Sequence, residues 1–134
     1  MTRWLVSSLL AAVVGTGWAA DTNGLAALRW QYRVIAVFAP TAEHGDQAYD
    51  TLQSSRGLDK RDIAWFVVGP DRIRTNLDRA ICRDALEAVH GNGYEAVLIG
   101  KDGQVKNRQA TLDLPRLFEA IDAMPMRQQE MRNR

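Results

Sequence analysis

Two short apolar runs, separated by about one helix length, constrain the fold of this chain more than any other feature. They cover residues 33–39 and 62–69, and a proline follows each directly, Pro40 and Pro70. Both runs are rich in branched residues and lack the strict alternation of half-exposed strands, which predicts strands buried on both faces. Because parallel neighbours need a crossover of about a dozen residues or more, the runs predict a βαβ unit with a right-handed crossover.

Apolar residues at helical spacing occur between these two runs and after the second one. Tyr49 and Leu52, ahead of Gly57, predict a modest helix that starts near Asp46. Between residues 75 and 91, apolar side chains recur at four-residue steps and predict one helix or two short ones.

The clearest local signal is Asp102-Gly103, which lies between an apolar run at residues 96–99 and the alternating residues 104–106. Asp and Gly both tolerate positive φ, so this pair between strand patterns favours a tight turn. The sequence therefore predicts an antiparallel hairpin over this stretch.

The last helical pattern has a clear start signal. Asp113 is a predicted N-cap, and Pro115 falls in the first turn, where its missing N–H costs nothing. The apolar residues that follow share one helical face and predict an amphipathic closing helix: Leu114, Leu117, Phe118 and Ile121.

Pro125 interrupts this closing pattern. Inside a continuous helix it would cost about 3 kcal/mol, so the helix is predicted to end or kink near Ala123. If Pro125 instead opens a new short helix, Arg127 and Glu130 become neighbours at a three-residue step. Two interpretations stay open: the tail caps an open edge of the core with Arg127 paired to an acid, or its methionines and arginines form an adaptable partner surface.

The order of elements is strand, helix, strand, helix, hairpin and helix. Alternating strands and helices, with a parallel central pair and an antiparallel strand added by the hairpin, place the chain in the α/β class. The predicted architecture is a thioredoxin-like three-layer sandwich, a mixed four-stranded sheet with flanking helices.

The N-terminal residues have the pattern of a secretory signal peptide. Arg3 precedes an apolar run at residues 4–14, and small residues follow up to Ala20. A membrane span needs about 20 predominantly apolar residues, and polar residues and glycine interrupt this run. We expect a signal peptide at residues 1–20, a single domain at residues 21–134, a periplasmic or secreted location, and no stable membrane insertion after cleavage.

The charge balance bears on the class of partner. The chain has 17 basic and 16 acidic residues, and removal of the signal peptide with Arg3 would leave 16 of each. A balanced charge gives no general attraction to nucleic acid or anionic lipid. We therefore expect no nucleic-acid binding, and a protein or envelope component of unknown identity as the partner.

Cys82 is the single cysteine, so the chain has neither an internal disulfide nor a two-cysteine redox cycle. In thioredoxin-like folds the reactive thiols follow the first strand, where a helix N-terminus stabilises a thiolate, but residues 40–46 contain no cysteine. Cys82 itself lies within a predicted helix among apolar neighbours, which favours a small core residue over a nucleophile.

Glu43, His44 and Asp46 have the composition of a metal or acid–base cluster. A charged surface loop has the same composition, and metal sites usually draw three or four ligands from more than one element. We predict no metal site, no cofactor and no catalytic residue.

Three stretches carry a resemblance to a known family. They are residues 29–33 with the strand that follows, LIGKDGQVK at residues 98–106, and IDAMPMRQQEM at residues 121–131. They resemble domain of unknown function 4174, a family of small exported bacterial proteins with a thioredoxin-like fold, found also in some animal extracellular-matrix and sushi-repeat proteins. The resemblance implies the fold over essentially the whole mature chain and implies no activity.

We therefore expect an extracytoplasmic, non-catalytic thioredoxin-like domain that serves as a binding or structural module. If it binds through the C-terminal segment, substitution of Arg127 and Glu130 impairs partner binding without lowering thermal stability. The alternative is an atypical single-cysteine redox enzyme, of the peroxidase or thiol-disulfide type, that uses Cys82. The same two interpretations stay open for Arg29, Trp30 and Arg33: Trp30 packs on the core with the two arginines stacked or paired, or the three residues belong to the partner surface. The candidate interaction residues are Arg29, Trp30, Arg33, Lys101, Asp102, Gly103, Lys106, Met124, Pro125, Met126, Arg127 and Glu130.

Overall fold

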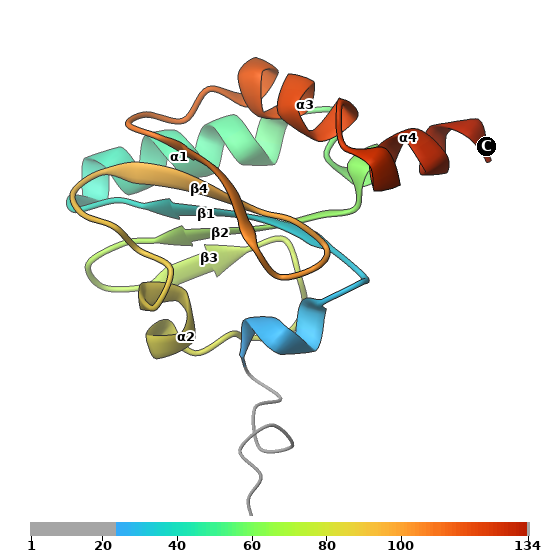
Figure 1. The fold of residues 1–134 in the computed structure, drawn as a ribbon. Coiled ribbons are helices and arrows are strands. Elements are labelled where there is room, and N and C mark those ends of the chain that lie inside the picture. Colours follow the sequence, from blue (N-terminus) through green and yellow to red (C-terminus); the bar gives the residue numbers. More distant parts are fainter. Residues whose placement is uncertain (1–23, 134) are drawn as a thin grey trace, which may run out of the picture.

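A mixed sheet with helices on both faces forms the centre of the computed structural model, which describes residues 24–133 (Figure 1). The predicted signal peptide at residues 1–20 lies outside the described residues. In chain order the elements are η2 (Leu25–Leu28), β1 (Arg33–Phe38), α1 (Ala42–Ser54), η3 (Asp59–Arg61), β2 (Ile63–Val68), β3 (Ile73–Thr75), α2 (Arg83–Glu87), β4 (Glu95–Ile99), β5 (Val105–Gln109), α3 (Leu114–Asp122) and α4 (Pro125–Arg132).

The two apolar runs form the centre of the sheet, whose strand order is β3-β2-β1-β4-β5. β1 and β2 are parallel and in register from Arg33 opposite Ile63 to Phe38 opposite Val68, and every residue of both strands is buried. The remaining neighbours are antiparallel. The α/β class and the buried parallel pair are thus confirmed, but the sheet has five strands among the described residues, so the prediction of four was wrong.

The additional strand is β3, which returns antiparallel along β2 after the Gly69-Pro70 turn. It has three half-buried residues, too few to produce an alternating pattern in the sequence. Asn76 continues the pairing where β3 stops: its side chain accepts a hydrogen bond from the Trp65 N–H at 2.9 Å and donates one to the Ile63 carbonyl at 3.0 Å.

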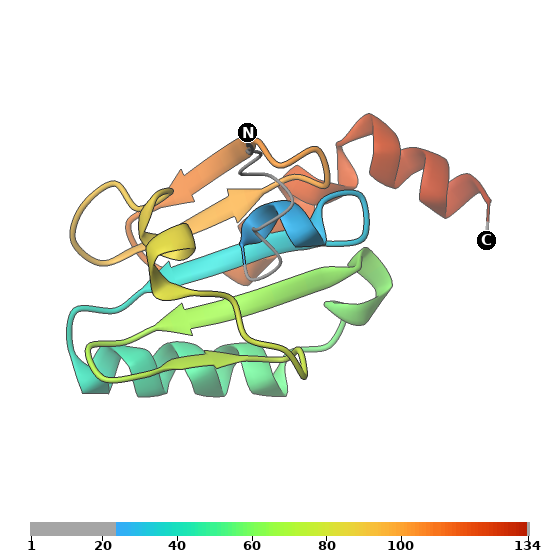
Figure 2. The same cartoon turned by 90° about the horizontal axis from the view of Figure 1, so that it is seen from below.

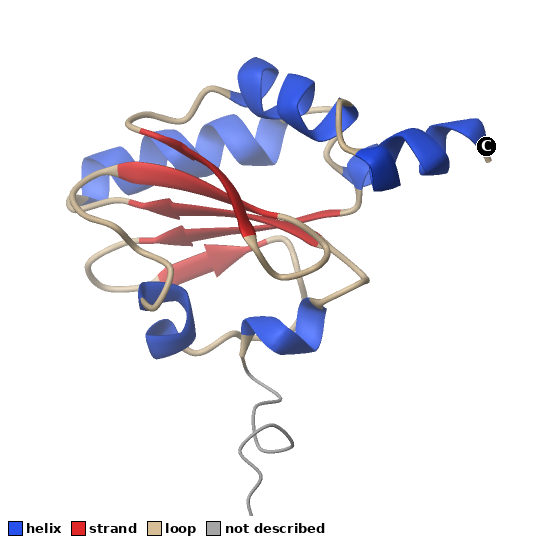
Figure 3. Cartoon of the chain, in the orientation of Figure 1, coloured by secondary structure: helices blue, strands red, loops and turns tan. Residues whose placement is uncertain are grey.

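Alternate residues of the central strands pack into two apolar clusters, one on each face of the sheet. Ile35 and Val37 face α1 and α3, whereas Val34 and Phe38 face η2 and α2. Figure 2 looks onto the face of the sheet that the shorter α2 and η2 cover, and Figure 3 shows the layers edge-on, with α1 and α3 on the other side of the sheet. Helices on both faces explain why the strands read as continuous apolar runs.

The first helix begins earlier than predicted. α1 starts at Ala42 rather than near Asp46, because Thr41 caps it: the Thr41 hydroxyl accepts a hydrogen bond from the His44 N–H at 3.1 Å. The helix predicted between residues 75 and 91 is reduced to the five residues of α2, so the apolar recurrence overstated its length.

The predicted hairpin is confirmed, with β4 and β5 antiparallel and an irregularity between Leu98 and Ile99. The loop is longer than a two-residue turn and covers residues 100–104, which we call the hairpin loop. Gly103 adopts φ +86°, a conformation that favours glycine, and the Asp102 side chain accepts a hydrogen bond from the Gln104 N–H at 3.0 Å.

The closing helix α3 begins as its sequence predicts. The Asp113 carboxylate accepts a hydrogen bond from the Arg116 N–H at 3.2 Å, and Leu117 and Ile121 are fully buried. α3 ends at Asp122, and Pro125 opens a separate helix, α4. Proline at the start of a helix is well placed because the first N–H groups have no intrahelical acceptor.

The Asp113 cap gives a first prediction. Asp113→Ala should lower the free energy of unfolding by about 1 kcal/mol, because the substitution leaves an N–H of the first turn without its side-chain acceptor. Asp113→Asn is the matched control, since the amide oxygen can accept the same bond. Urea unfolding of the three proteins measures the difference, and equal losses in both variants would show that the cap contributes nothing specific.

Candidate functional site

The three stretches that stand out in the sequence meet at one end of the sheet. Arg33 begins β1, and because β4 is antiparallel to β1, the hairpin loop that follows β4 lies at the same end. The backbone of residues 29–30 crosses this loop, where the Trp30 N–H donates to the Lys101 carbonyl at 2.7 Å. α4 projects from this end of the molecule (Figure 2).

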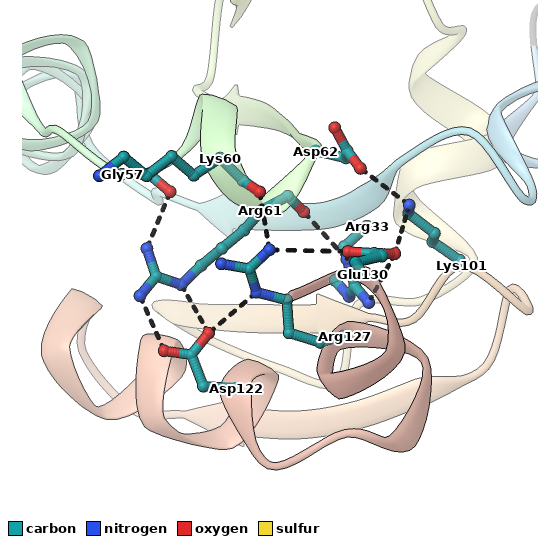
Figure 4. A network of polar contacts seen from close by, with 9 residues as sticks. All are labelled: Arg33, Gly57, Lys60, Arg61, Asp62, Lys101, Asp122, Arg127 and Glu130. Atoms are coloured by element: carbon teal, nitrogen blue, oxygen red, sulfur yellow. Dashed lines mark hydrogen bonds and ion pairs between the residues drawn. The ribbon is translucent and has the colours of Figure 1, made fainter. Parts of the chain in front are cut away.

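Glu130 of α4 pairs with a cation from each of the other two stretches. Its carboxylate lies 3.2 Å from Nη1 of Arg33 and 2.7 Å from Nζ of Lys101 (Figure 4). Lys101 also lies 2.9 Å from the carboxylate of Asp62, the residue between η3 and β2. Arg33 is only 1% exposed, so Glu130 supplies the carboxylate that faces a guanidinium almost fully removed from water.

Arg127 extends the same network towards η3. Arg127 is 5% exposed, and its guanidinium donates to Asp122 at 3.2 Å and to the Lys60 carbonyl at 2.9 Å and lies 3.7 Å from Glu130. Asp122 also accepts two hydrogen bonds from Arg61, at 3.0 and 2.8 Å. α4 is therefore tied to α3, η3, β1 and the hairpin loop by charged side chains (Figure 4).

This geometry supports the interpretation of the tail as a cap over an open edge of the core. Arg127 pairs with acids, and its spacing to Glu130 is the predicted three-residue neighbour contact. Removal of one partner from a buried ion pair leaves an uncompensated charge. The expectation that Arg127 and Glu130 can be replaced without loss of stability therefore gives way to the opposite one.

The cations determine how the two acids titrate. Burial raises the pKa of Glu130, but the hydrogen bonds and the positive charges of Lys101 and Arg33 together outweigh it, and the pKa is lowered from its ordinary value of 4.5. The pKa of Asp122 is lowered from 3.8, chiefly by the hydrogen bonds from Arg61 and in addition by Arg127. The neighbouring cations thus favour the ionised form of both Asp122 and Glu130.

A pH dependence of stability follows. A carboxyl whose pKa is lower in the folded state stabilises the protein fully above its unfolded pKa, and this contribution is lost as the pH falls through the folded value. Stability should therefore decline on acidification below about pH 4.5, and Glu130→Gln should lose less stability than the unmodified protein between about pH 5 and pH 3. Urea unfolding across that range tests this, and parallel curves for the two proteins would contradict it.

Beside the network lies a cleft of about 500 Å³ between the hairpin loop and the turn from α3 to α4. We call the second wall, residues 120–126, the elbow. Seven candidate interaction residues line the cleft: Arg33, Lys101, Asp102, Lys106, Met124, Pro125 and Met126; Gly100, Ala120 and Ala123 complete it. Sequence reasoning missed the two alanines, because an alanine in a helical pattern carries no signal of a binding surface.

Large exposed apolar side chains gather at the same end of the described chain. Trp30 is 61% exposed and adopts φ +71°, and Met126 and Met131 of α4 are each 42% exposed. Of the two interpretations left open for Trp30, packing on the core therefore does not hold. Its N–H is held by the hairpin loop in a conformation that directs the ring outwards, whereas Leu28 fills the core position nearby.

The remaining candidates have contacts of their own. Arg29 lies against the hairpin loop, where a Cβ at Gly103 would come within 2.9 Å of its Nε. Lys106 pairs with Asp102 at 2.9 Å, and its side chain crosses Gly100. All twelve candidate residues thus belong to the hairpin loop, the start of β5, the elbow, α4, or the chain just before and at the start of β1.

Cys82 is not the core residue that the sequence suggests. It is exposed and precedes α2, whose N–H groups at Ala85 and Leu86 bond to the Cys82 carbonyl. Ile81, the residue before it, fills the core instead. Exposure alone does not make a nucleophile, and within residues 24–133 no hydrogen bond to the Cys82 thiol is present.

His44 and Asp46, which follow β1, contact different partners. The His44 ring stacks on Tyr94 with centroids 4.6 Å apart, whereas Asp46 pairs with Arg74 at 2.7 Å. Among the described residues, no three His, Cys, Asp or Glu side chains are grouped so that they could hold a metal ion.

The family comparison covers the fold and the cleft together. The model of the domain of unknown function DUF4174 matches residues 24–130, from η2 to Glu130. The chain belongs to the DUF4174 family. The match includes all twelve candidate residues, so in this DUF4174 protein the hairpin loop, the elbow and Glu130 are part of the family domain. No curated protein and no solved structure matches the chain.

One further observation concerns membranes. In the part of this DUF4174 protein that the structure describes, none of the helices combines the length and the apolar character needed to cross a bilayer.

Proposed function

We propose that this DUF4174 protein is an exported, non-catalytic binding domain on a thioredoxin-like framework, and that a protein or envelope component binds at the cleft. One observation carries the proposal: residues from three distant stretches frame a cleft of about 500 Å³. Ligand sites are concave, mostly apolar and supplied with a few polar groups, and this cleft has that character.

The arrangement of four strands supports the thioredoxin-like assignment. β2, β1, β4 and β5 are adjacent in that order, with β1 parallel to β2 and both remaining pairs antiparallel. α1 connects the parallel pair and α3 closes the same face of the sheet. In this framework β3 is an addition at one edge.

The position of the cleft supports a role other than thiol chemistry. In thioredoxin-like proteins the reactive thiols follow β1, which here is the stretch from Pro40 to Asp46, and its Thr41 hydroxyl is used as a helix cap. The cleft lies at the opposite end of β1, a six-residue strand that spans about 20 Å. The proposed binding site is thus separate from the position where such folds place their thiols.

The signal-peptide pattern of residues 1–20 supports export. Cleavage would leave the DUF4174 domain as a single exported unit. N-terminal sequencing of the protein recovered outside the cytoplasm tests this part of the proposal, and recovery of the intact N-terminus from the cytoplasm alone would contradict it.

A site-specific photo-crosslinker tests the binding role. Placed at Met126, on the wall of the cleft, it should give a discrete adduct when the protein is expressed in its own cell. Placed at Asn92, an exposed residue near the other end of the sheet, it should give none. Equal adducts at both positions, or none at either, would contradict binding at the cleft.

A further inference from the structure

We infer that the cleft binds a small carboxylic acid with an apolar body, an inference that rests on the proposed binding function and gives it a ligand class. Two different surfaces of the cleft would contact the two parts of such a molecule. The elbow supplies the surface for the apolar body, and the cations at the hairpin loop supply the surface for the carboxylate.

The elbow is an apolar wall. Residues from the end of α3, the turn after it and the start of α4 line the cleft: Ala120, Ala123, Met124, Pro125 and Met126. Methionine side chains adapt to ligands of different shape, and the two small alanines leave room between them. The volume of about 500 Å³ lies in the range of small-molecule sites and accommodates a chain or ring of modest size.

The opposite wall is cationic. Arg33, Lys101 and Lys106 line the cleft with a single carboxylate, Asp102. When the residues paired with them are added, the linked groups are five cations and four carboxylates, one positive charge in excess: Arg33, Arg61, Lys101, Lys106 and Arg127 against Asp62, Asp102, Asp122 and Glu130. One negative charge on a ligand would balance this group.

Arg33 contributes to the cationic wall through its charge. It lies beside the cleft but is 1% exposed, and its Nη1 and Nη2 are already bonded to Glu130 and to the Arg61 carbonyl. Its enclosed Nε is out of reach of a ligand in the cleft. The direct contacts to a ligand carboxylate therefore fall to Lys101 and Lys106, whose ammonium groups can form charge-assisted hydrogen bonds.

A neutral apolar molecule is the main competitor, because the elbow alone would suffice for it. An extended peptide added along β5 is less well supported, since that edge is short, irregular in register and carries Lys106 and Arg108. Charged residues and irregularities are features that discourage the pairing of edge strands. The ligand class is therefore distinguished by comparing an acid with its neutral analogue.

Titration with octanoate and with 1-octanol, followed by isothermal calorimetry and amide chemical shifts, makes this comparison. We expect saturable binding of octanoate, with shifts confined to the hairpin loop and the elbow. Octanol should bind roughly tenfold more weakly or worse, because it lacks the charge-assisted hydrogen bonds. Equal binding of the two ligands, or no saturable binding of octanoate, would overturn the inference.

Three variants locate the binding. Lys106→Met removes a cation of the cleft and should weaken octanoate binding several-fold, whereas Lys60→Met makes the same change at an exposed residue outside the cleft and should leave binding unchanged. Ala123→Phe should block the cleft, with thermal unfolding to show that the protein remains folded. Octanoate binding that survives Ala123→Phe in a folded protein would place the ligand elsewhere and overturn the inference.

The two proposals can fail separately. If octanoate does not bind but the crosslinker at Met126 still captures one partner, the ligand class is wrong and the binding role stands. If neither experiment gives a signal at the cleft, both are wrong.

Discussion

Glu130→Ala should lower the free energy of unfolding by about 3 kcal/mol. Glu130 is the carboxylate that faces Arg33, whose side chain is 1% exposed, and it also pairs with Lys101. The substitution leaves a buried cation without its partner, which is among the most destabilising single changes in proteins. Urea unfolding at pH 7, analysed by linear extrapolation, measures the loss.

The control for this prediction is Gln128→Ala, on the same helix. Gln128 is exposed, so its replacement should change stability by no more than about 0.5 kcal/mol. If Glu130→Ala resembles Gln128→Ala, the network does not stabilise the fold. In that case the original expectation, that Glu130 can be replaced without loss of stability, would be restored.

Truncation after Ala123 should have a still larger effect. It removes Glu130, Arg127 and the partly buried Met124 together, so Arg33 loses its acid and the main apolar cluster loses a covering residue. We expect a loss of more than about 4 kcal/mol, a large part of the 5–15 kcal/mol typical of a domain. Circular dichroism with thermal unfolding should show a protein that is partly unfolded at room temperature or melts far earlier.

A chain that ends after Arg132 is the matched control for the truncation. It retains α4 and all of the ion pairs described above, so its melting curve should overlie that of the full chain. If truncation after Ala123 also left the melting temperature unchanged, α4 would be an appendage, and a role confined to partner binding would be the better account.

The sequence was most informative where one local interaction decides the outcome. The parallel strands follow from buried branched runs, and the hairpin follows from Asp102-Gly103. The break at Pro125 follows from a missing N–H, and it holds here because Met124 is extended before α4 begins. The hairpin and the break at Pro125 are set by neighbouring residues, and the parallel pair is indicated by composition because both strands are apolar throughout.

The errors lie where distant contacts decide. β3 is a strand because β2 and the Asn76 side chain hold it, not because of its own three residues. Trp30 points outwards because the Lys101 carbonyl fixes its backbone, and Cys82 is exposed because Ile81 takes the core position. Single-sequence patterns contain none of these partners.

The candidate site was predictable only in the parts that local spacing decides. The residues of the hairpin loop and the C-terminal segment were identified individually, and the pairing of Arg127 with Glu130 followed from helical spacing. The contact between Arg33 and Glu130 spans 97 positions and could not be inferred from spacing. That contact, with the pair of Glu130 and Lys101, places the C-terminal segment beside the hairpin loop, which the pairing of β1 with β4 has already brought next to Arg33.

A double-mutant cycle on Arg33 and Glu130 tests the central claim, that this buried pair holds the C-terminal helix in place beside the cleft. Urea unfolding would be measured for Arg33→Met, Glu130→Ala and the double variant. The predicted result is that the double variant is more stable than the sum of the single losses implies, by about 1.5 kcal/mol or more. Losses that add within about 0.5 kcal/mol would show that the two side chains are not coupled, and would contradict the claim.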